Sequence, residues 1–273
     1  SAASDVYKRQ TFYEYKFPRL RTGIMAGSPC PIKVMQLVVD KMGMREITIT
    51  YGQTEASPAC TMTTTEDSLD LRVATVGRAM PHVETKIVDP ETGETLPPYQ
   101  QGEFCARGYN VMRGYYKMEE ATRQAIDEDG WLHTGDIGTM DEDGNFRITG
   151  RLKDMIIRGG ENIYPREIEE FLYTHPAVSD VQVVGVPDEK YGEEVCACVI
   201  LKKDCTATKE ELIEFVREGL SKFKAPRYVL LMDSFPMTAS GKIQKFKLRE
   251  MGVDLLGLSL IHISEPTRPR LIS

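Results

Sequence analysis

Residues 51–55, Tyr-Gly-Gln-Thr-Glu, place several polar side chains directly after an apolar, alternating segment. The alternation predicts a strand, so the polar groups would leave the strand at its carboxyl end. Ligands of open α/β sheets gather at the carboxyl ends of strands. The stretch could therefore face a nucleotide, although an ordinary polar loop at a strand exit fits these five residues equally well.

Asp136 ends a second stretch, Trp-Leu-His-Thr-Gly-Asp at 131–136. One carboxylate can accept hydrogen bonds from both vicinal hydroxyls of a ribose, and such charge-assisted bonds are the stronger kind. Thr-Gly-Asp is equally typical of a turn in which the aspartate binds local amides. The motif alone thus leaves a ribose site and a turn as alternatives.

Glycine and lysine supply the remaining candidates. The pair Gly159–Gly160 would let a ligand lie along the backbone, but a glycine pair before a helix is also typical of a plain turn. Lys242, in Ser-Gly-Lys, could neutralise charge that develops on a phosphate. A solvated basic turn explains the same three residues, and they do not form a Walker loop, which needs Gly-x-x-x-x-Gly-Lys-Ser/Thr. We interpret the basic residues that follow, Lys245, Lys247 and Arg249, as a solvated face.

The elements expected to position the first candidates form a β-α-β unit. Residues 23–29 are typical of a buried strand that runs into a turn, apolar residues recur at helical spacing over 34–42, and 47–52 form the next strand. A glycine, Gly27 or Gly52, lies at each strand exit. This pattern indicates the end of a larger α/β domain.

Two further patterns follow along the chain. From 76 to 148, short strands alternate with Gly, Pro and Asp turns, which predicts a distorted β-barrel or sandwich. After residue 150 the pattern predicts a small α+β domain. Its expected elements are strands at 155–158, 181–186, 195–201 and 228–232 and helices at 165–174 and 208–222. Pro165 suits a first helical position, and Thr208 with Glu211 makes a capping box.

Composition favours a cytoplasmic enzyme. The formal net charge of −7 argues against a nucleic-acid partner, and no apolar run reaches the roughly 20 residues that span a bilayer. The six cysteines include no Cys-x-x-Cys pair, and we interpret all of them as reduced thiols. Cys196 and Cys198 should face the same side of a strand. The scattered histidines do not indicate a zinc site.

The order and spacing of four stretches resemble the adenylate-forming superfamily. The stretches are 51–55, 131–136, 150–169 (Gly-Arg-Leu-Lys-Asp-Met through Glu) and 236–244 (Pro-Met-Thr-Ala-Ser-Gly-Lys-Ile-Gln). Members of this superfamily use ATP to convert a carboxylic acid to an acyl-adenylate, which is usually passed to coenzyme A. The resemblance implies that 11–150 is the C-terminal part of an AMP-binding α/β domain with a barrel subdomain. Residues 151–253 would be a small, mobile C-terminal α+β domain.

The resemblance implies a nucleotide site in the first part of the chain. Tyr51, followed by Gly52, would stack on adenine, and the loop at Gly27–Ser28 would form part of the adenine wall. Thr54 would contact the phosphates. Glu55 would hold Mg²⁺, which prefers carboxylate and phosphate oxygens.

The resemblance also implies two conformations. Asp136 would bind the ribose, Arg151 would reach the ribose or a phosphate, and Lys153 would be the hinge about which the C-terminal domain rotates. Lys242 would serve the adenylation step. After rotation, Gly159–Gly160 would line the pantetheine tunnel, where the thiol attacks the acyl carbon and AMP leaves.

Residues 150–169 and 241–249 are most similar to medium-chain fatty acyl-CoA synthetases. This likeness implies an ATP-binding ligase of fatty acid metabolism, with a medium- to long-chain fatty acid, ATP and coenzyme A as substrates. Two alternatives stay open: an adenylation domain that loads a carrier protein, and a catalytically silent nucleotide-binding fragment.

Both ends of the chain resemble translated sequencing adapter. The transposon-end DNA GATGTGTATAAGAGACAG encodes residues 5–10, and its reverse complement encodes residues 258–263. We therefore expect 1–10 and 258–273 to be adapter-derived. We also expect the chain to be an incomplete fragment, inactive by itself, that lacks the N-terminal part of its protein with the phosphate loop.

Overall fold

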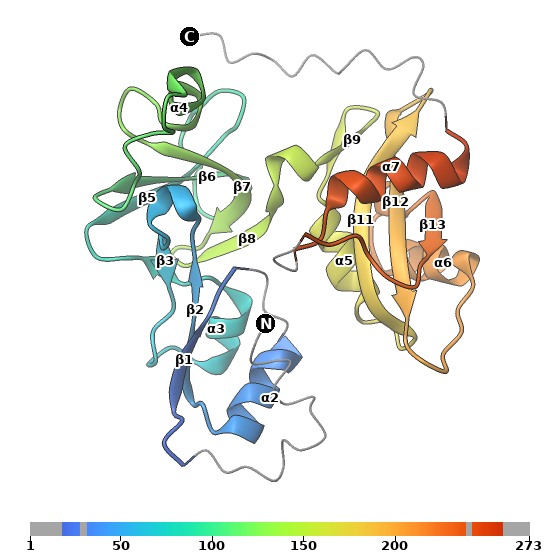
Figure 1. Ribbon diagram of the computed structural model, residues 1–273, viewed down its shortest axis with the longest axis horizontal. Coiled ribbons are helices and arrows are strands. Elements are labelled where there is room, and N and C mark those ends of the chain that lie inside the picture. Colours follow the sequence, from blue (N-terminus) through green and yellow to red (C-terminus); the bar gives the residue numbers. More distant parts are fainter. Residues whose placement is uncertain (1–17, 28–31, 239–241, 259–273) are drawn as a thin grey trace. The chain divides into compact units, whose positions relative to one another are not determined.

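The computed structural model describes residues 18–27, 32–238 and 242–258 (Figure 1). Contacts divide the chain into two compact units, with the boundary between Ile148 and Thr149. We refer to them as unit 1 and unit 2 and describe each by itself.

The first sheet of unit 1 contains the predicted β-α-β unit, whose order is confirmed, but its first strand is mostly exposed and not buried as predicted, with Ile24 60% exposed. Its elements are β1 (Thr22–Met25), α2 (Ile32–Met42) and β2 (Glu46–Tyr51), followed by β3 (Thr61–Met62) and β4 (Arg78–Ala79). β1 and β2 are parallel, and β3 and β4 extend the sheet in antiparallel fashion. Met35 and Val38 of α2 are buried against Ile47 and Ile49 of β2, because residues three or four apart share one helix face.

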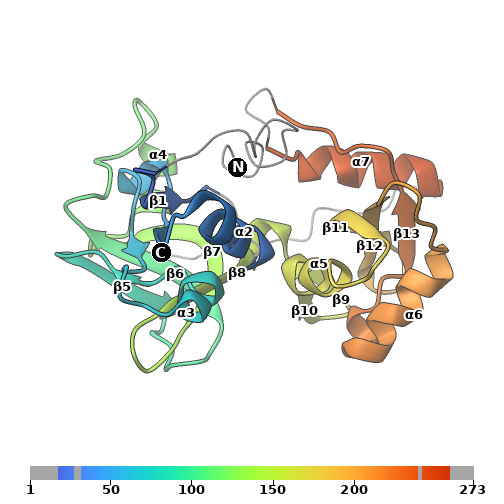
Figure 2. The same ribbon diagram turned by 90° about the horizontal axis from the view of Figure 1, so that it is seen from below.

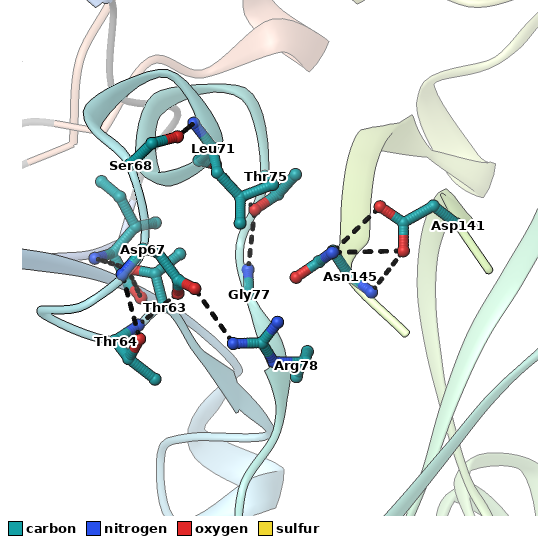
Figure 3. Close-up of polar contacts among 11 residues, drawn as sticks. Thr63, Thr64, Asp67, Ser68, Leu71, Thr75, Gly77, Arg78, Asp141 and Asn145 are labelled. Carbon is teal, nitrogen blue, oxygen red and sulfur yellow. Dashed lines mark hydrogen bonds and ion pairs between the residues drawn. The ribbon is translucent and has the colours of Figure 1, made fainter. Parts of the chain in front are cut away.

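The segment between β3 and β4 is held by side-chain hydrogen bonds (Figure 3). Asp67 accepts bonds from the Thr64 amide at 2.6 Å and from the Arg78 guanidinium at 3.0 Å. Ser68 caps α3 (Leu69–Ala74), a short helix not predicted from the sequence, by accepting from the amide of Leu71. These bonds fix the chain where it turns back into β4.

The second sheet of unit 1 is antiparallel and confirms the predicted region of short strands. It contains β5 (Val83–Val88), β6 (Gly102–Gly108), β7 (Leu132–Met140) and β8 (Phe146–Arg151) in that order, and β8 runs across the unit boundary. Helix α4 (Glu119–Ala125) lies between β6 and β7 in the chain. The first five residues of β6 are all buried, so polar side chains on this strand must find partners inside the protein.

Unit 2 is the predicted α+β domain. Its elements are η3 (Leu152–Asp154), β9 (Ile156–Arg158), β10 (Glu161–Ile163), α5 (Pro165–Leu172), β11 (Val178–Asp188), β12 (Gly192–Leu201), α6 (Lys209–Gly219), η4 (Lys222–Lys224), β13 (Tyr228–Leu231) and α7 (Lys245–Leu256). The sheet order is β10-β9-β12-β11, and β13 adds to β12 in parallel. Pro165 begins α5, and the capping box of Thr208 and Glu211 begins α6, as predicted.

Helices cover both faces of the unit 2 sheet, with α5 and α6 on one side and α7 on the other (Figure 2). Val183 faces the first core and Val184 the second, because successive strand residues point to opposite faces. Cys196 and Cys198 lie together under α7, which confirms the prediction that they share a face. Every cysteine in the described part of the chain is free.

Helix α7 was not predicted, and it corrects the interpretation of Lys245 and Arg249 as part of a solvated face, whereas Lys247 is exposed as predicted. The ammonium of Lys245 lies 2.7 Å from Glu169, and Arg249 lies 2.9 Å from Glu193. Leu248 of the same helix is fully buried. Among the residues with described structure, no helix has the length and apolar character needed to cross a bilayer.

Candidate functional site

Tyr51 and Asp136 meet where the two sheets of unit 1 come together. The Tyr51 hydroxyl, at the end of β2, donates a hydrogen bond of 2.8 Å to Oδ2 of Asp136 in the middle of β7. Asp136 is only 6% exposed. Burial, together with the negative charge of Asp136, raises the pKa of Tyr51 well above its usual value, so the phenol remains a proton donor. The sequence identified both residues, but not the bond between them.

The surroundings of this pair explain its geometry. The ring of Tyr51 packs edge-on against Phe104, with centroids 5.0 Å apart. Thr134 donates to the carbonyl of Phe104 at 2.6 Å and accepts from the amide of Asp136 at 3.1 Å. Thr-Gly-Asp therefore lies within strand β7 and does not form the turn that the sequence also allowed. Phe104 was not predicted as part of the site, because an apolar strand residue carries no signal for such a role.

Glu55 lies in η2 (Thr54–Ala56), directly after the strand exit, and is half-buried beside the exposed Thr54. Its Oε1 accepts a hydrogen bond of 2.8 Å from the hydroxyl of Tyr115, and its carbonyl accepts one from the amide of Met112. The hydrogen bond to Glu55 is the main cause that raises the pKa of Tyr115. The loop that carries Tyr115 was not predicted as part of the site, because it lies about 60 residues beyond Glu55 in the chain.

The two predicted glycines of this region differ in their surroundings. A Cβ on Gly52 would lie 2.0 Å from the carbonyl oxygen of Pro58, so only glycine fits there. Gly27 follows β1 with a φ of 82° in open space. Ser28 lies outside the described residues, so its predicted role in the adenine wall stays a prediction.

The candidate residues at the start of unit 2 are exposed. Arg151 ends β8, and Lys153 follows in η3; both are exposed. Gly159 and Gly160 form the turn between β9 and β10, with φ values of 60° and 88°. The Gly159 amide donates to the carbonyl of Tyr191 at 2.8 Å, and the Tyr191 ring lies against Gly159. The glycine pair is thus a turn, as the alternative interpretation stated, and its Gly160 side is open.

Lys242 is exposed, and its backbone is fixed by Thr238. The Lys242 carbonyl accepts from the Thr238 amide at 2.8 Å, and the Lys242 amide donates to the Thr238 hydroxyl at 3.0 Å. Met237 and Ile243 pair in an antiparallel bridge on either side. Residues 239–241, which precede the lysine, lie outside the described structure.

Two family models match the chain. The model described as AMP-binding enzyme matches residues 3–116, and the AMP-binding enzyme C-terminal domain matches residues 167–242. The first match starts inside the segment that resembles adapter, so the limit of that segment at residue 10 stays a prediction.

Curated relatives carry acyl-CoA names. The chain is 60% identical over 248 residues to "Putative acyl-CoA synthetase YngI" of Bacillus subtilis (strain 168), a match that covers 91% of this chain and 45% of the relative. It is 49% identical over 246 residues to "Medium-chain acyl-CoA ligase ACSF2, mitochondrial" of Bos taurus, covering 90% of this chain and 40% of the relative. The chain therefore spans less than half the length of these relatives.

Solved structures share the fold. ATP-bound MatB from Rhodopseudomonas palustris matches with a TM-score of 0.79 and 36% identity over 85% of this chain and 45% of that one. The o-succinylbenzoate CoA synthetase MenE from Bacillus subtilis, in complex with its acyl-adenylate intermediate, matches with a TM-score of 0.77 and 31% identity over 90% and 49%. These likenesses confirm the predicted α/β and α+β fold class, and together with the two family models they show that the chain belongs to the AMP-binding family of adenylate-forming enzymes.

Proposed function

We propose that this chain is part of an enzyme that activates a fatty acid with ATP and transfers the acyl group to coenzyme A. The reaction would release AMP and pyrophosphate. The observation that carries the proposal is the buried Asp136 carboxylate held by Tyr51, in a chain whose relatives are named as acyl-CoA synthetases or ligases.

Unit 1 would bind the nucleotide. Asp136 would accept hydrogen bonds from the ribose hydroxyls, while the bond from Tyr51 holds the carboxylate in place. The Tyr51 ring would lie along the adenine, and the exposed Thr54 would contact the phosphates. Fixing the nucleotide in this way reduces the entropy lost in reaching the transition state.

Glu55 fits the expected Mg²⁺ site. Its carboxylate is a hard oxygen donor, half-exposed, and Tyr115 holds one of its oxygens. When bound, the ion would neutralise charge on the phosphate oxygens.

Unit 2 would supply the groups that differ between the two half-reactions. During adenylation, the exposed ammonium of Lys242 would neutralise negative charge as the fatty acid carboxylate attacks the α-phosphorus and pyrophosphate leaves. Arg151 would contact the ribose or a phosphate. Lys153, in the short η3 helix beside the unit boundary, would be the hinge for the change between the two conformations.

Thioester formation would use the turn at Gly159–Gly160. A Cβ on Gly160 would meet no atom within 4 Å, so the turn offers bare backbone on which a pantetheine chain could lie. The thiol would then attack the acyl carbon, and AMP would leave with the electrons of the broken acyl–phosphate bond.

A medium-chain fatty acid is the proposed substrate. The relatives named as medium-chain ligases are 45–49% identical to this chain, whereas the structures named for o-succinylbenzoate and anthranilate are 31% and 28% identical. We also propose a cytoplasmic location, supported by the free thiols of unit 1 and unit 2.

Binding of AMP to the chain tests the nucleotide site. We expect Asp136→Asn to weaken AMP binding in calorimetry by about 10- to 150-fold, because a hydrogen bond to a charged group contributes about 1.5–3 kcal/mol. Asp143→Asn is the matched control, since it removes an exposed carboxylate from the turn after β7. Equal affinities for the two variants would contradict the ribose assignment.

The proposed reaction is tested by reading the gene across both ends of this sequence and assaying the protein that the complete reading frame encodes. We expect ATP-dependent formation of decanoyl-CoA, and little product from o-succinylbenzoate or anthranilate. Transfer to a carrier-protein thiol but not to coenzyme A would instead favour the carrier-loading alternative.

A further inference from the structure

Three side chains that bind metals in other proteins meet on the second sheet of unit 1. Glu103 and Cys105 are two residues apart on β6, and His133 lies directly opposite Cys105 on β7. One ligand atom from each residue lies within 4.8 Å of the other two. The proposed nucleotide and coenzyme A roles use none of these three groups.

The two distances from His133 in this cluster are close to those of a tetrahedral zinc site. Nδ1 of His133 lies 3.6 Å from Sγ of Cys105 and 2.8 Å from Oε2 of Glu103. Zinc bonds of about 2.3 Å to sulfur and about 2.0 Å to nitrogen or oxygen place tetrahedral ligands about 3.6 Å apart for N and S, and about 3.3 Å apart for N and O. The first distance therefore already fits, and the second requires the carboxylate to move by roughly half an ångström.

The cluster also has the outer contacts that orient metal ligands. Oε1 of Glu103 accepts a hydrogen bond of 2.8 Å from the amide of Gly135, which leaves Oε2 facing the histidine. The other ring nitrogen of His133 lies 3.5 Å from the carboxylate of Asp127. A carboxylate on the second nitrogen fixes the tautomer and ring orientation of a metal-binding histidine.

Burial and donor chemistry select the kind of ion. Cys105 is fully buried and Glu103 is 7% exposed, while the His133 side chain is 28% exposed and gives access from solvent. A thiolate, an imidazole and a carboxylate suit zinc and similar borderline ions, whereas Mg²⁺ and Ca²⁺ prefer oxygen ligands alone.

We propose that Glu103, Cys105 and His133 form a binding site for Zn²⁺ or a chemically similar divalent transition-metal ion, with three protein ligands and one position for water. The site is separate from the oxygen ligand Glu55 and does not depend on the proposed ligase activity. The competing explanation is a metal-free ion pair between His133 and Glu103, in which a proton occupies the place of the metal.

Cobalt is the probe that separates the two explanations, because Co²⁺ occupies tetrahedral zinc sites and gives a thiolate-to-metal charge-transfer absorption. We expect the reduced, metal-free chain to bind one equivalent of Co²⁺ with this absorption and to lose it when Zn²⁺ is added. Cys105→Ser should abolish the absorption. Cys205→Ser, which changes an exposed thiol, should leave it unchanged.

Two outcomes would overturn the proposal: no charge-transfer absorption in the wild-type chain, or an absorption that survives in Cys105→Ser. If Cys105→Ser does not fold, as judged by circular dichroism, the remaining ligands decide. His133→Gln should weaken Co²⁺ binding by more than about 100-fold, and Asp127→Asn by about tenfold. His175→Gln, a change in unit 2, should have no effect. Unchanged Co²⁺ affinity in His133→Gln would leave the ion pair as the explanation.

Discussion

The hydrogen bond between Tyr51 and Asp136 should contribute to the stability of unit 1, and Tyr51→Phe removes it with little change in shape. The hydroxyl donates at 2.8 Å to a carboxylate that is 6% exposed. Hydrogen bonds to charged groups contribute about 1.5–3 kcal/mol. We therefore expect the free energy of unfolding to fall by that amount, which is a factor of about 10 to 150 in the folding equilibrium.

Urea unfolding followed by tryptophan fluorescence measures this change. Trp131 is the single tryptophan of the chain and lies in unit 1, with the ammonium of Lys86 4.2 Å from its ring centroid. Tyr109→Phe is the matched control, since the Tyr109 side chain is exposed. It should change the free energy of unfolding by no more than about 0.5 kcal/mol.

A double-mutant cycle with Asp136→Asn isolates the pair from the other partners of Asp136. We expect a coupling energy above about 1 kcal/mol, because the two groups are in direct contact. If the effects of the two substitutions simply add, or if Tyr51→Phe behaves like Tyr109→Phe, the bond does not stabilise the junction of the two sheets.

Two further substitutions in unit 1 have predictable effects on stability. Gly52→Ala should destabilise the unit by about 1–3 kcal/mol in urea unfolding, because the new methyl group would overlap backbone; Gly150→Ala, in the part of β8 that lies just beyond the unit boundary and with open space around it, should be nearly neutral, and equal effects would contradict the close-packing explanation. Burial acts to raise the pKa of Asp67, but hydrogen bonds from Thr64 and the charge of Arg78 together lower it. A carboxylate with a lowered folded-state pKa stabilises the protein above its unfolded pKa of about 4 and loses this effect as pH falls. Asp67→Asn should therefore be less stable than wild type at pH 7, and a gap that stayed constant down to pH 3 would show that the charge of Asp67 contributes nothing.

Local sequence patterns predicted most of the regular structure. Apolar spacing identified α2, and capping chemistry placed the starts of α5 and α6 correctly. These signals act within one or two helical turns, so a single chain segment contains them. Helix α7 was missed because its first turn is basic, and only the fold shows that Lys245 faces Glu169 of α5 and Arg249 faces Glu193 of β12.

The contacts that build the sites depend on strand register, which local patterns do not determine. Tyr51 and Asp136 are 85 residues apart in sequence, and His133 is 28 residues from Cys105. A register shift between Glu103 and Cys105 lies at the centre of the second cluster. No sequence pattern predicted a Cys-His-Glu cluster, because its members are adjacent only across two paired strands.

Strand β7 connects the two clusters through three consecutive residues. Thr134 holds the amide of Asp136, Gly135 donates its amide to Glu103, and Asp136 accepts from Tyr51. Gly135 has a φ of 69°, a left-handed conformation that glycine adopts without strain. The amide of Gly135 donates to Glu103, and the next residue, Asp136, carries the carboxylate that faces Tyr51. A side chain at Gly135 would meet no neighbouring atom, so space does not explain the glycine of Thr-Gly-Asp. Its backbone conformation does, because it sets the direction of the chain on which both the candidate ribose site and the proposed metal site depend.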